Sequence, residues 1–98
     1  MIIHEVLTQL KTAAGPVVKI LQRSDNIKVI VLGLKKGMIL KEHKTGITTK
    51  LVIVEGSVIY KEGNASVTIN KFEDIDIPVN VLHSVEAVED SICFLIQG

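Results

Sequence analysis

The sequence predicts an all-β fold, an antiparallel sandwich or barrel, and two observations carry this prediction. Val and Ile make up much of the 47% hydrophobic content, and their branching at Cβ favours extended strands. After Pro16 the chain consists of short apolar runs separated by turn residues, with no helical period between them. A chain of 98 residues has room for a single domain with one core.

Residues 1–15 are expected to form an N-terminal arm ahead of the β-barrel, which takes residues 16–98. Val6, Leu7 and Leu10 stand at helical spacing, and Gly15 followed by Pro16 supplies a stop signal. We therefore expect a short helix within residues 4–14 that caps one end of the core.

Nine strands are expected between the turn signals. Their ranges are Val17–Leu21, Ile27–Leu34, Met38–His43, Leu51–Val54, Val58–Lys61, Val67–Ile69, Ile75–Ile77, Leu82–Val88 and Ile92–Ile96.

Alternation along these strands assigns side chains to faces, because successive residues of a strand point to opposite sides. His83 shares its face with core residues of its strand, and Thr49 shares its face with Leu51. Asp74 and Asp76 alternate with Ile residues and are expected outside. The face of His43 stays open, because a bend before the next turn would reset the alternation.

Charge and composition exclude several classes of function. Lys plus Arg and Asp plus Glu both number 11, and the chain has three aromatic residues of the Phe, Tyr and Trp types. A nucleic-acid surface needs a basic face and usually stacking aromatics, so none is expected. Neither a secretory signal nor an apolar stretch long enough for a membrane span is present. The cytoplasm is the expected location.

Cys93 is the single cysteine, so an internal disulfide and a multi-thiolate zinc site are both excluded. It lies in an apolar strand, and we expect a small buried hydrophobic residue rather than a reactive thiol.

Two segments of the chain resemble the motifs of the cupin superfamily, the small RmlC-like jelly-roll barrels also called double-stranded β-helices. The first family motif reads Gly, five residues, His-x-His, three or four residues, Glu, six residues, Gly. Gly37, His43 and Gly56 match it, whereas Thr45 stands at the second His and Thr49 at the Glu.

The second family motif reads Gly, five residues, Pro-x-Gly, two residues, His, three residues, Asn. Pro78 and His83 match it. Glu73 is aligned with the first Gly, Asn80 with the second and Ala87 with the Asn. Asn80 is a mild departure, since Asn tolerates the left-handed backbone conformation better than most residues.

The resemblance implies a cupin barrel with a degenerate metal site. A complete cupin site presents three His and one Glu, and this chain aligns only His43 and His83 with them. Threonine hydroxyls do not replace imidazole or carboxylate ligands. Any divalent ion, whether Zn, Ni, Fe or Mn, is therefore expected to bind weakly, and His43 and His83 could instead be polar residues bonded to water or to Thr45 and Thr49.

Three functions follow from this reasoning. The leading one is a binding module without catalytic residues, whose pocket is lined by His43, Thr45, Thr49 and His83 and accepts a small molecule. The second is a metal-dependent enzyme of oxygenase or isomerase type, with His43 and His83 as ligands and a third from His4, water or substrate. The third is a structural barrel that only dimerises. The resemblance to small cupins, among which dimers are common, also implies a homodimer, and pairing of edge strands between two copies would cover open backbone groups.

Overall fold

The computed structural model describes all 98 residues and consists of one helix followed by nine antiparallel strands. The elements are α1 (Ile2–Leu10), β1 (Val17–Arg23), β2 (Lys28–Leu34), β3 (Ile39–His43), β4 (Thr49–Glu55), β5 (Ser57–Glu62), β6 (Ala65–Asn70), β7 (Asp74–Ile77), β8 (His83–Ala87) and β9 (Ser91–Gln97). Every predicted strand is present, with ends within two residues of the predicted ones.

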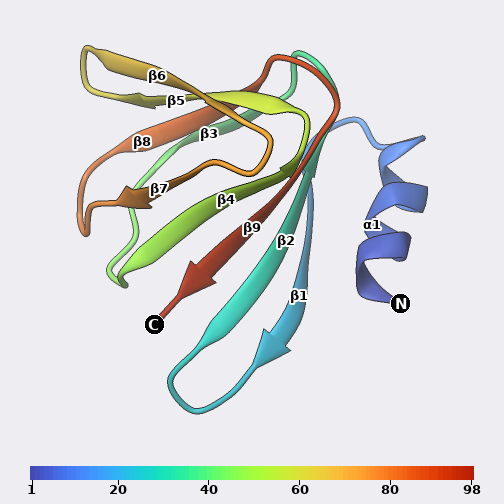
Figure 1. Ribbon diagram of the computed structural model, residues 1–98, viewed down its shortest axis with the longest axis horizontal. Helices are drawn as coiled ribbons and strands as arrows, with labels where there is room; N and C mark the ends of the chain where they lie inside the picture. Colours follow the sequence, from blue (N-terminus) through green and yellow to red (C-terminus); the bar gives the residue numbers. More distant parts are fainter.

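The strands form two sheets that face each other across the core. One sheet has the order β1-β2-β9-β4-β7 and the other the order β3-β8-β5-β6. Figure 1 shows the two layers close together at the upper right and spreading apart toward the left. We call the spread side, where β3 ends and β8 begins, the wide end of the barrel.

The core lies between the sheets and is built from alternate residues of almost every strand. Its largest buried members come from β2 and β4, among them Leu32, Leu34, Leu51 and Ile53. Thr49 continues the same inward face of β4 and is 3% exposed. Asp74 and Asp76 point outward and both pair with Lys50. The faces predicted for these residues are therefore confirmed.

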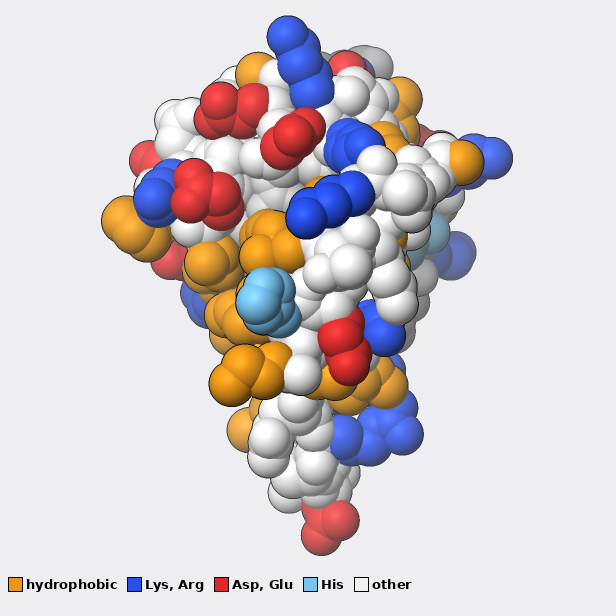
Figure 2. Space-filling view, turned by 90° about the vertical axis from the view of Figure 1, so that its right-hand side faces the viewer, with side chains coloured by type: hydrophobic (Ala, Val, Ile, Leu, Met, Phe, Trp, Pro, Cys, Tyr) orange, Lys and Arg blue, Asp and Glu red, His pale blue; other side chains and the backbone are white.

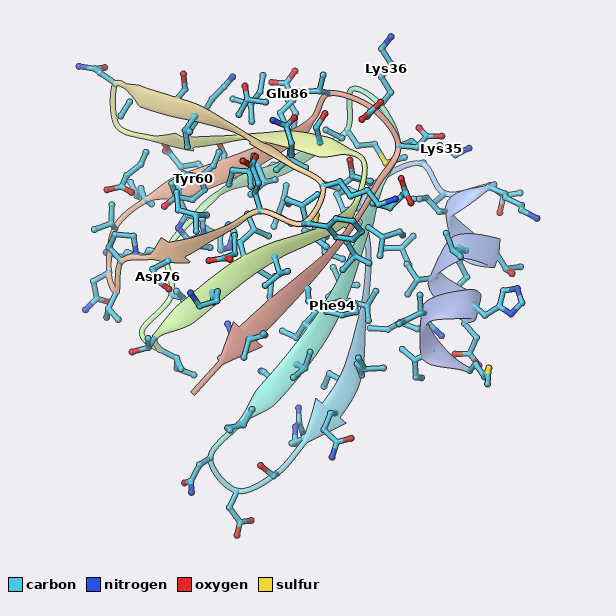
Figure 3. All side chains as sticks on the ribbon, in the orientation of Figure 1. Lys35, Lys36, Tyr60, Asp76, Glu86 and Phe94 are labelled. Carbon is cyan, nitrogen blue, oxygen red and sulfur yellow. The ribbon has the colours of Figure 1, made fainter.

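Helix α1 packs on the outer face of the five-stranded sheet rather than over an end of the core. Val6 and Leu10 form a second apolar cluster with Val31 and Ile92, and Figure 3 shows Phe94 on the helix side of β9. Gly33 permits this approach, because a Cβ there would lie 2.7 Å from Cγ1 of Val6. The expectation that the helix caps one end of the core was wrong. Both faces of β2 are apolar, with Leu32 in the core between the sheets and Val31 on the outer face, and the helix buries the outer face.

The helix is also displaced from its predicted range. It begins at Ile2 and ends at Leu10, and its C-cap residue Lys11 keeps a right-handed conformation. The ammonium group of Lys35 donates to the carbonyl oxygen of Lys11 at 2.7 Å. This hydrogen bond satisfies a carbonyl at the end of the helix, so Gly15 is not the residue that stops it.

Two residues other than glycine have left-handed backbones at turns of the second motif. Asn80 has φ 61°, as its alignment with a family Gly implies. The first Gly position is occupied by Phe72, with φ 69°, and not by its neighbour Glu73. The alignment of Glu73 was therefore one residue off. Phe72 is 79% exposed, so no packing of its ring offsets the strain of this conformation.

Candidate functional site at the wide end of the barrel

His43 and His83 meet at the wide end, on neighbouring strands. They are directly opposed in the β3–β8 ladder, and their ring centroids lie 4.3 Å apart with the planes tilted by 56°. The ladder register shifts between Leu40 and His43. This bulge puts one extra residue into β3 and so returns His43 to the inward face that Leu40 and His83 share.

The two imidazoles differ in exposure. His83 is 2% exposed, whereas His43 is exposed at the rim. The ring of Tyr60 lies behind His83, with centroids 5.8 Å apart and planes 25° from parallel. Figure 3 shows Tyr60 between the two layers of the barrel. The pair is thus backed by an aromatic wall and open toward solvent on one side.

Both rings are oriented by backbone carbonyls. Nδ1 of His43 lies 2.8 Å from the carbonyl oxygen of Lys41, and Nδ1 of His83 lies 3.0 Å from that of Val81. A carbonyl oxygen only accepts hydrogen bonds, so each Nδ1 carries the hydrogen. In the neutral imidazole, Nε2 then has a free lone pair, as in His residues that bind metals.

The hydroxyl groups of Thr45 and Thr49 are hydrogen-bonded to groups other than the two imidazoles. The hydroxyl of Thr49 donates to the carbonyl oxygen of Ile47 at 2.9 Å and accepts from the amide of Gln97 at 3.4 Å. The hydroxyl of Thr45 accepts from the backbone N–H of Ile47 at 3.2 Å. Neither threonine is hydrogen-bonded to an imidazole, in contrast to one of the interpretations of the sequence. Their role in lining a pocket stays a prediction.

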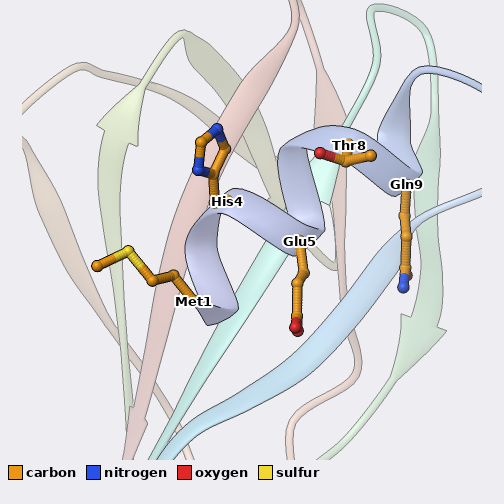
Figure 4. A pocket seen from close by; sticks show the side chains of 5 residues that line it. All are labelled: Met1, His4, Glu5, Thr8 and Gln9. Atoms are coloured by element: carbon orange, nitrogen blue, oxygen red, sulfur yellow. The ribbon is translucent and has the colours of Figure 1, made fainter.

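His4 lies far from the pair in the fold. It is exposed on α1, on the outer side of the five-stranded sheet, and Figure 4 shows it projecting from the helix beside Met1. His4 therefore does not supply the third ligand that the enzyme hypothesis considered. No group of three or more His, Cys, Asp or Glu side chains in the chain could hold a metal ion.

The residues present consequently do not fit a resident metal held by a full set of protein ligands. Two imidazoles leave most of the coordination positions of a divalent ion to water.

Sequence reasoning missed Tyr60 and Glu62, which extend the site along β5. The hydroxyl of Tyr60 donates to Oε2 of Glu62 at 3.0 Å. Burial, together with the nearby carboxylate of Glu62, raises the pKa of Tyr60 to about 12. The phenol therefore remains a hydrogen-bond donor at neutral pH. The alternation of Val58, Tyr60 and Glu62 on one face of β5 was the available signal.

Known proteins match the chain only through structure. No family model and no curated protein matches the sequence. A conserved protein with a double-stranded β-helix domain from Klebsiella pneumoniae superposes with a TM-score of 0.82 at 13% identity, covering 95% of this chain and 85% of that one. KdgF from a Halomonas species gives 0.80 at 15% identity, covering 88% and 82%.

A third structure is an RmlC-like cupin from Desulfovibrio desulfuricans, with a TM-score of 0.75 at 23% identity over 85% of this chain and 82% of that one. At such identities the likeness establishes the fold. The chain has the cupin fold, a double-stranded β-helix with one short N-terminal helix. The resemblance seen in the two sequence motifs is confirmed at this level.

The chain has no helix with the length and apolar character needed to span a membrane. Figure 2 looks onto the side that carries α1, where acidic and basic side chains are interspersed among apolar ones.

Proposed function

We propose that this cupin-fold domain is a binding module that accepts a small molecule at its wide end, where His43 and His83 meet. The observation that carries the proposal is the pair of imidazoles in contact, each oriented by a carbonyl oxygen at Nδ1. Two Nε2 atoms with free lone pairs accept hydrogen bonds from a ligand, and the hollow that His43 lines with Val18 and Ile39 offers apolar surface to a small organic molecule.

The same arrangement favours weak binding of a divalent ion. Neutral imidazole suits Zn²⁺, Ni²⁺ and Fe²⁺ and accepts Mn²⁺ less well. With only two protein ligands, we infer that an ion is exchanged readily with the solvent and shares the site with water or with the bound molecule. An oxygenase or isomerase would need a third metal ligand from water or substrate. Proton transfer by an imidazole is usually supported by a carboxylate at its other nitrogen, whereas both Nδ1 atoms here are bonded to backbone carbonyl oxygens.

We also propose that two copies associate through the open side between β1 and β3. Val18 and Ile20 face inward on the edge strand β1, yet they are 52% and 43% exposed because no strand of the second sheet covers them. Val18 also borders a wide hollow that is lined by Ile39 and His43. A second copy would bury this apolar surface, and the zero net charge of the chain does little to oppose association.

The test of the site uses protein purified without an affinity tag. We expect metal analysis to find substoichiometric metal that gel filtration removes. Native mass spectrometry should find a small molecule retained by the wild type and lost in His43→Ala. Titration with Zn²⁺ should shift the NMR signals of His43 and His83 and leave those of His4 unchanged, and His4→Ala should behave as the wild type.

Two results would contradict the proposal: one equivalent of metal retained after dialysis against a chelator, or His43→Ala protein that retains the same molecule as the wild type.

Association is tested separately, by light scattering after gel filtration. Ile20→Lys should convert a dimer into a monomer, whereas Val67→Lys, at an equally exposed residue of the opposite edge strand β6, should leave the dimer intact. A monomeric wild type, or a dimer that survives Ile20→Lys, would show that this surface is not the interface.

A further inference from the structure

The barrel has a second opening, between the two edge strands β6 and β7, and it differs in chemistry from the wide end. The sheets are not hydrogen-bonded to each other along this side. A hollow of about 200 Å³ lies there, and its lining residues are Tyr60, Glu62, Ala65, Ser66, Val67 and Ile75. The imidazole pair belongs to β3 and β8, on the other side of β5 in the strand order.

The walls of this hollow are mainly apolar. Val67 faces the interior opposite Tyr60 in the β5–β6 ladder, but it is 46% exposed because nothing packs over the edge. Ile75 approaches from β7 and is only partly buried. An apolar surface left open beside a protein core is suited to the apolar part of a ligand. The volume lies below the range of about 300–1,000 Å³ typical of drug-sized ligands, so the ligand is small.

Glu62 is the one charged group of the hollow, and it has no cationic partner. The ion pairs of the chain use Glu5, Glu55, Asp74, Asp76 and Glu86. Glu62 is half-buried and accepts a single hydrogen bond, from Tyr60. A partly desolvated carboxylate without a counter-charge is costly, and a cation that reaches it is correspondingly favoured.

We propose that this hollow binds a small organic cation, with the ammonium group at the carboxylate of Glu62 and the apolar body against Tyr60, Val67 and Ile75. The hydroxyl of Tyr60 holds Oε2 of Glu62 at 3.0 Å and so fixes the carboxylate in the hollow before the ligand arrives. The hollow adjoins the imidazole pair, because the ring of Tyr60 is stacked on that of His83, but its charged group is Glu62, and the organic cation goes beyond the proposed function.

The probe is benzylammonium, compared with its neutral isostere benzyl alcohol and with benzoate. Backbone amide NMR should show saturable shifts confined to β5, β6 and β7, with benzyl alcohol at least about tenfold weaker, the ratio expected for loss of a charged hydrogen bond. Glu62→Gln should remove the preference for the cation while its amide oxygen still accepts from Tyr60.

Glu86→Gln is the matched control, since it removes the same charge from the outer face of β8, where Glu86 pairs with Lys61. It should bind benzylammonium as the wild type does. Val67→Lys offers a second variant: it places an ammonium group on the wall of the hollow and should abolish binding of the probe. His43→Ala should bind the probe unchanged, which distinguishes this site from the wide end.

The proposal is overturned if benzylammonium causes no saturable shifts in the millimolar range, or if the shifts lie outside these three strands. It is equally overturned if Glu62→Gln retains the preference for the cation over benzyl alcohol.

Discussion

His43 faces His83 across the β3–β8 ladder because the register shifts between Leu40 and His43. Strict alternation from Leu40 would have turned His43 to the outer face, since the two residues are three positions apart. The bulge adds one residue to β3, and the imidazoles come within 4.3 Å. The candidate site therefore depends on an irregularity in one strand and not only on the presence of two histidines.

Tyr60 should titrate with a midpoint near pH 12, because burial and the carboxylate of Glu62 raise its pKa to about 12. It is the only tyrosine, and the chain has no tryptophan, so ultraviolet absorbance follows this phenol alone. The unfolded chain should titrate near the reference value of about 10. A native midpoint near that reference would show that the phenol is open to solvent.

The same shift predicts a loss of stability in alkali. The folded pKa is above the unfolded one, so the native state binds more protons between these values, and the free energy of unfolding falls as pH rises through them. We expect urea unfolding to show a decline from about pH 10 to about pH 12 that is smaller in Tyr60→Phe. Equal slopes for the two proteins would contradict the assignment to Tyr60.

Cys93 should be unreactive in the native protein. It is fully buried, and this burial raises the pKa of its thiol to about 12. The thiolate is the reactive form, so a disulfide reagent at neutral pH should label the protein only as fast as it unfolds. In urea the same reagent should label one thiol per chain at once. Rapid native labelling that is independent of urea would show a route to Cys93 through the barrel wall.

Gly33→Ala should weaken the attachment of α1 to the sheet. The added methyl would lie 2.7 Å from Cγ1 of Val6, a fully buried side chain with a restricted rotamer. Overpacking of this kind costs about 1–3 kcal/mol of unfolding free energy, measured by urea denaturation. Gly15→Ala is the matched control, because no atom lies within 4 Å of a Cβ there. Equal stability of the two variants would show that the helix adjusts without cost.

The sequence predicted most of the fold because alternation is a local property of each strand. It placed Thr49 and His83 inward and Asp74 and Asp76 outward, as the structure has them. It could not fix the face of His43, because a bulge leaves no signature in a short run such as Ile39–His43. It also missed the hollow beside Glu62, which depends on how far two edge strands from different sheets lie apart.

The remaining errors concern α1 and the turn before β7. Helical spacing located the apolar stripe of α1, but tertiary contacts decided both where it ends and that it covers β2. The first Gly of the second motif was aligned with Glu73, whereas a spacing of five residues before Pro78 leads to Phe72, the residue with the left-handed backbone.

Phe72→Gly should stabilise the protein, since Phe72 has φ 69° and is 79% exposed. Side chains with a Cβ cost about 1–2 kcal/mol in the left-handed region. The ring contributes little in return, because its contact with Lys71 is at the surface, 5.0 Å from Nζ to the ring centroid. We expect a gain of about 0.5–1 kcal/mol in the free energy of unfolding by urea denaturation.

Phe72→Ala separates strain from the loss of the ring, because alanine removes the ring and keeps the Cβ. It should leave stability near that of the wild type or lower it slightly. If Phe72→Ala stabilised as much as Phe72→Gly, the gain would come from removing an exposed aromatic and not from the backbone. If Phe72→Gly destabilised the protein, the ring would have to pack against a surface, and a second copy of the chain would then be the first candidate for it.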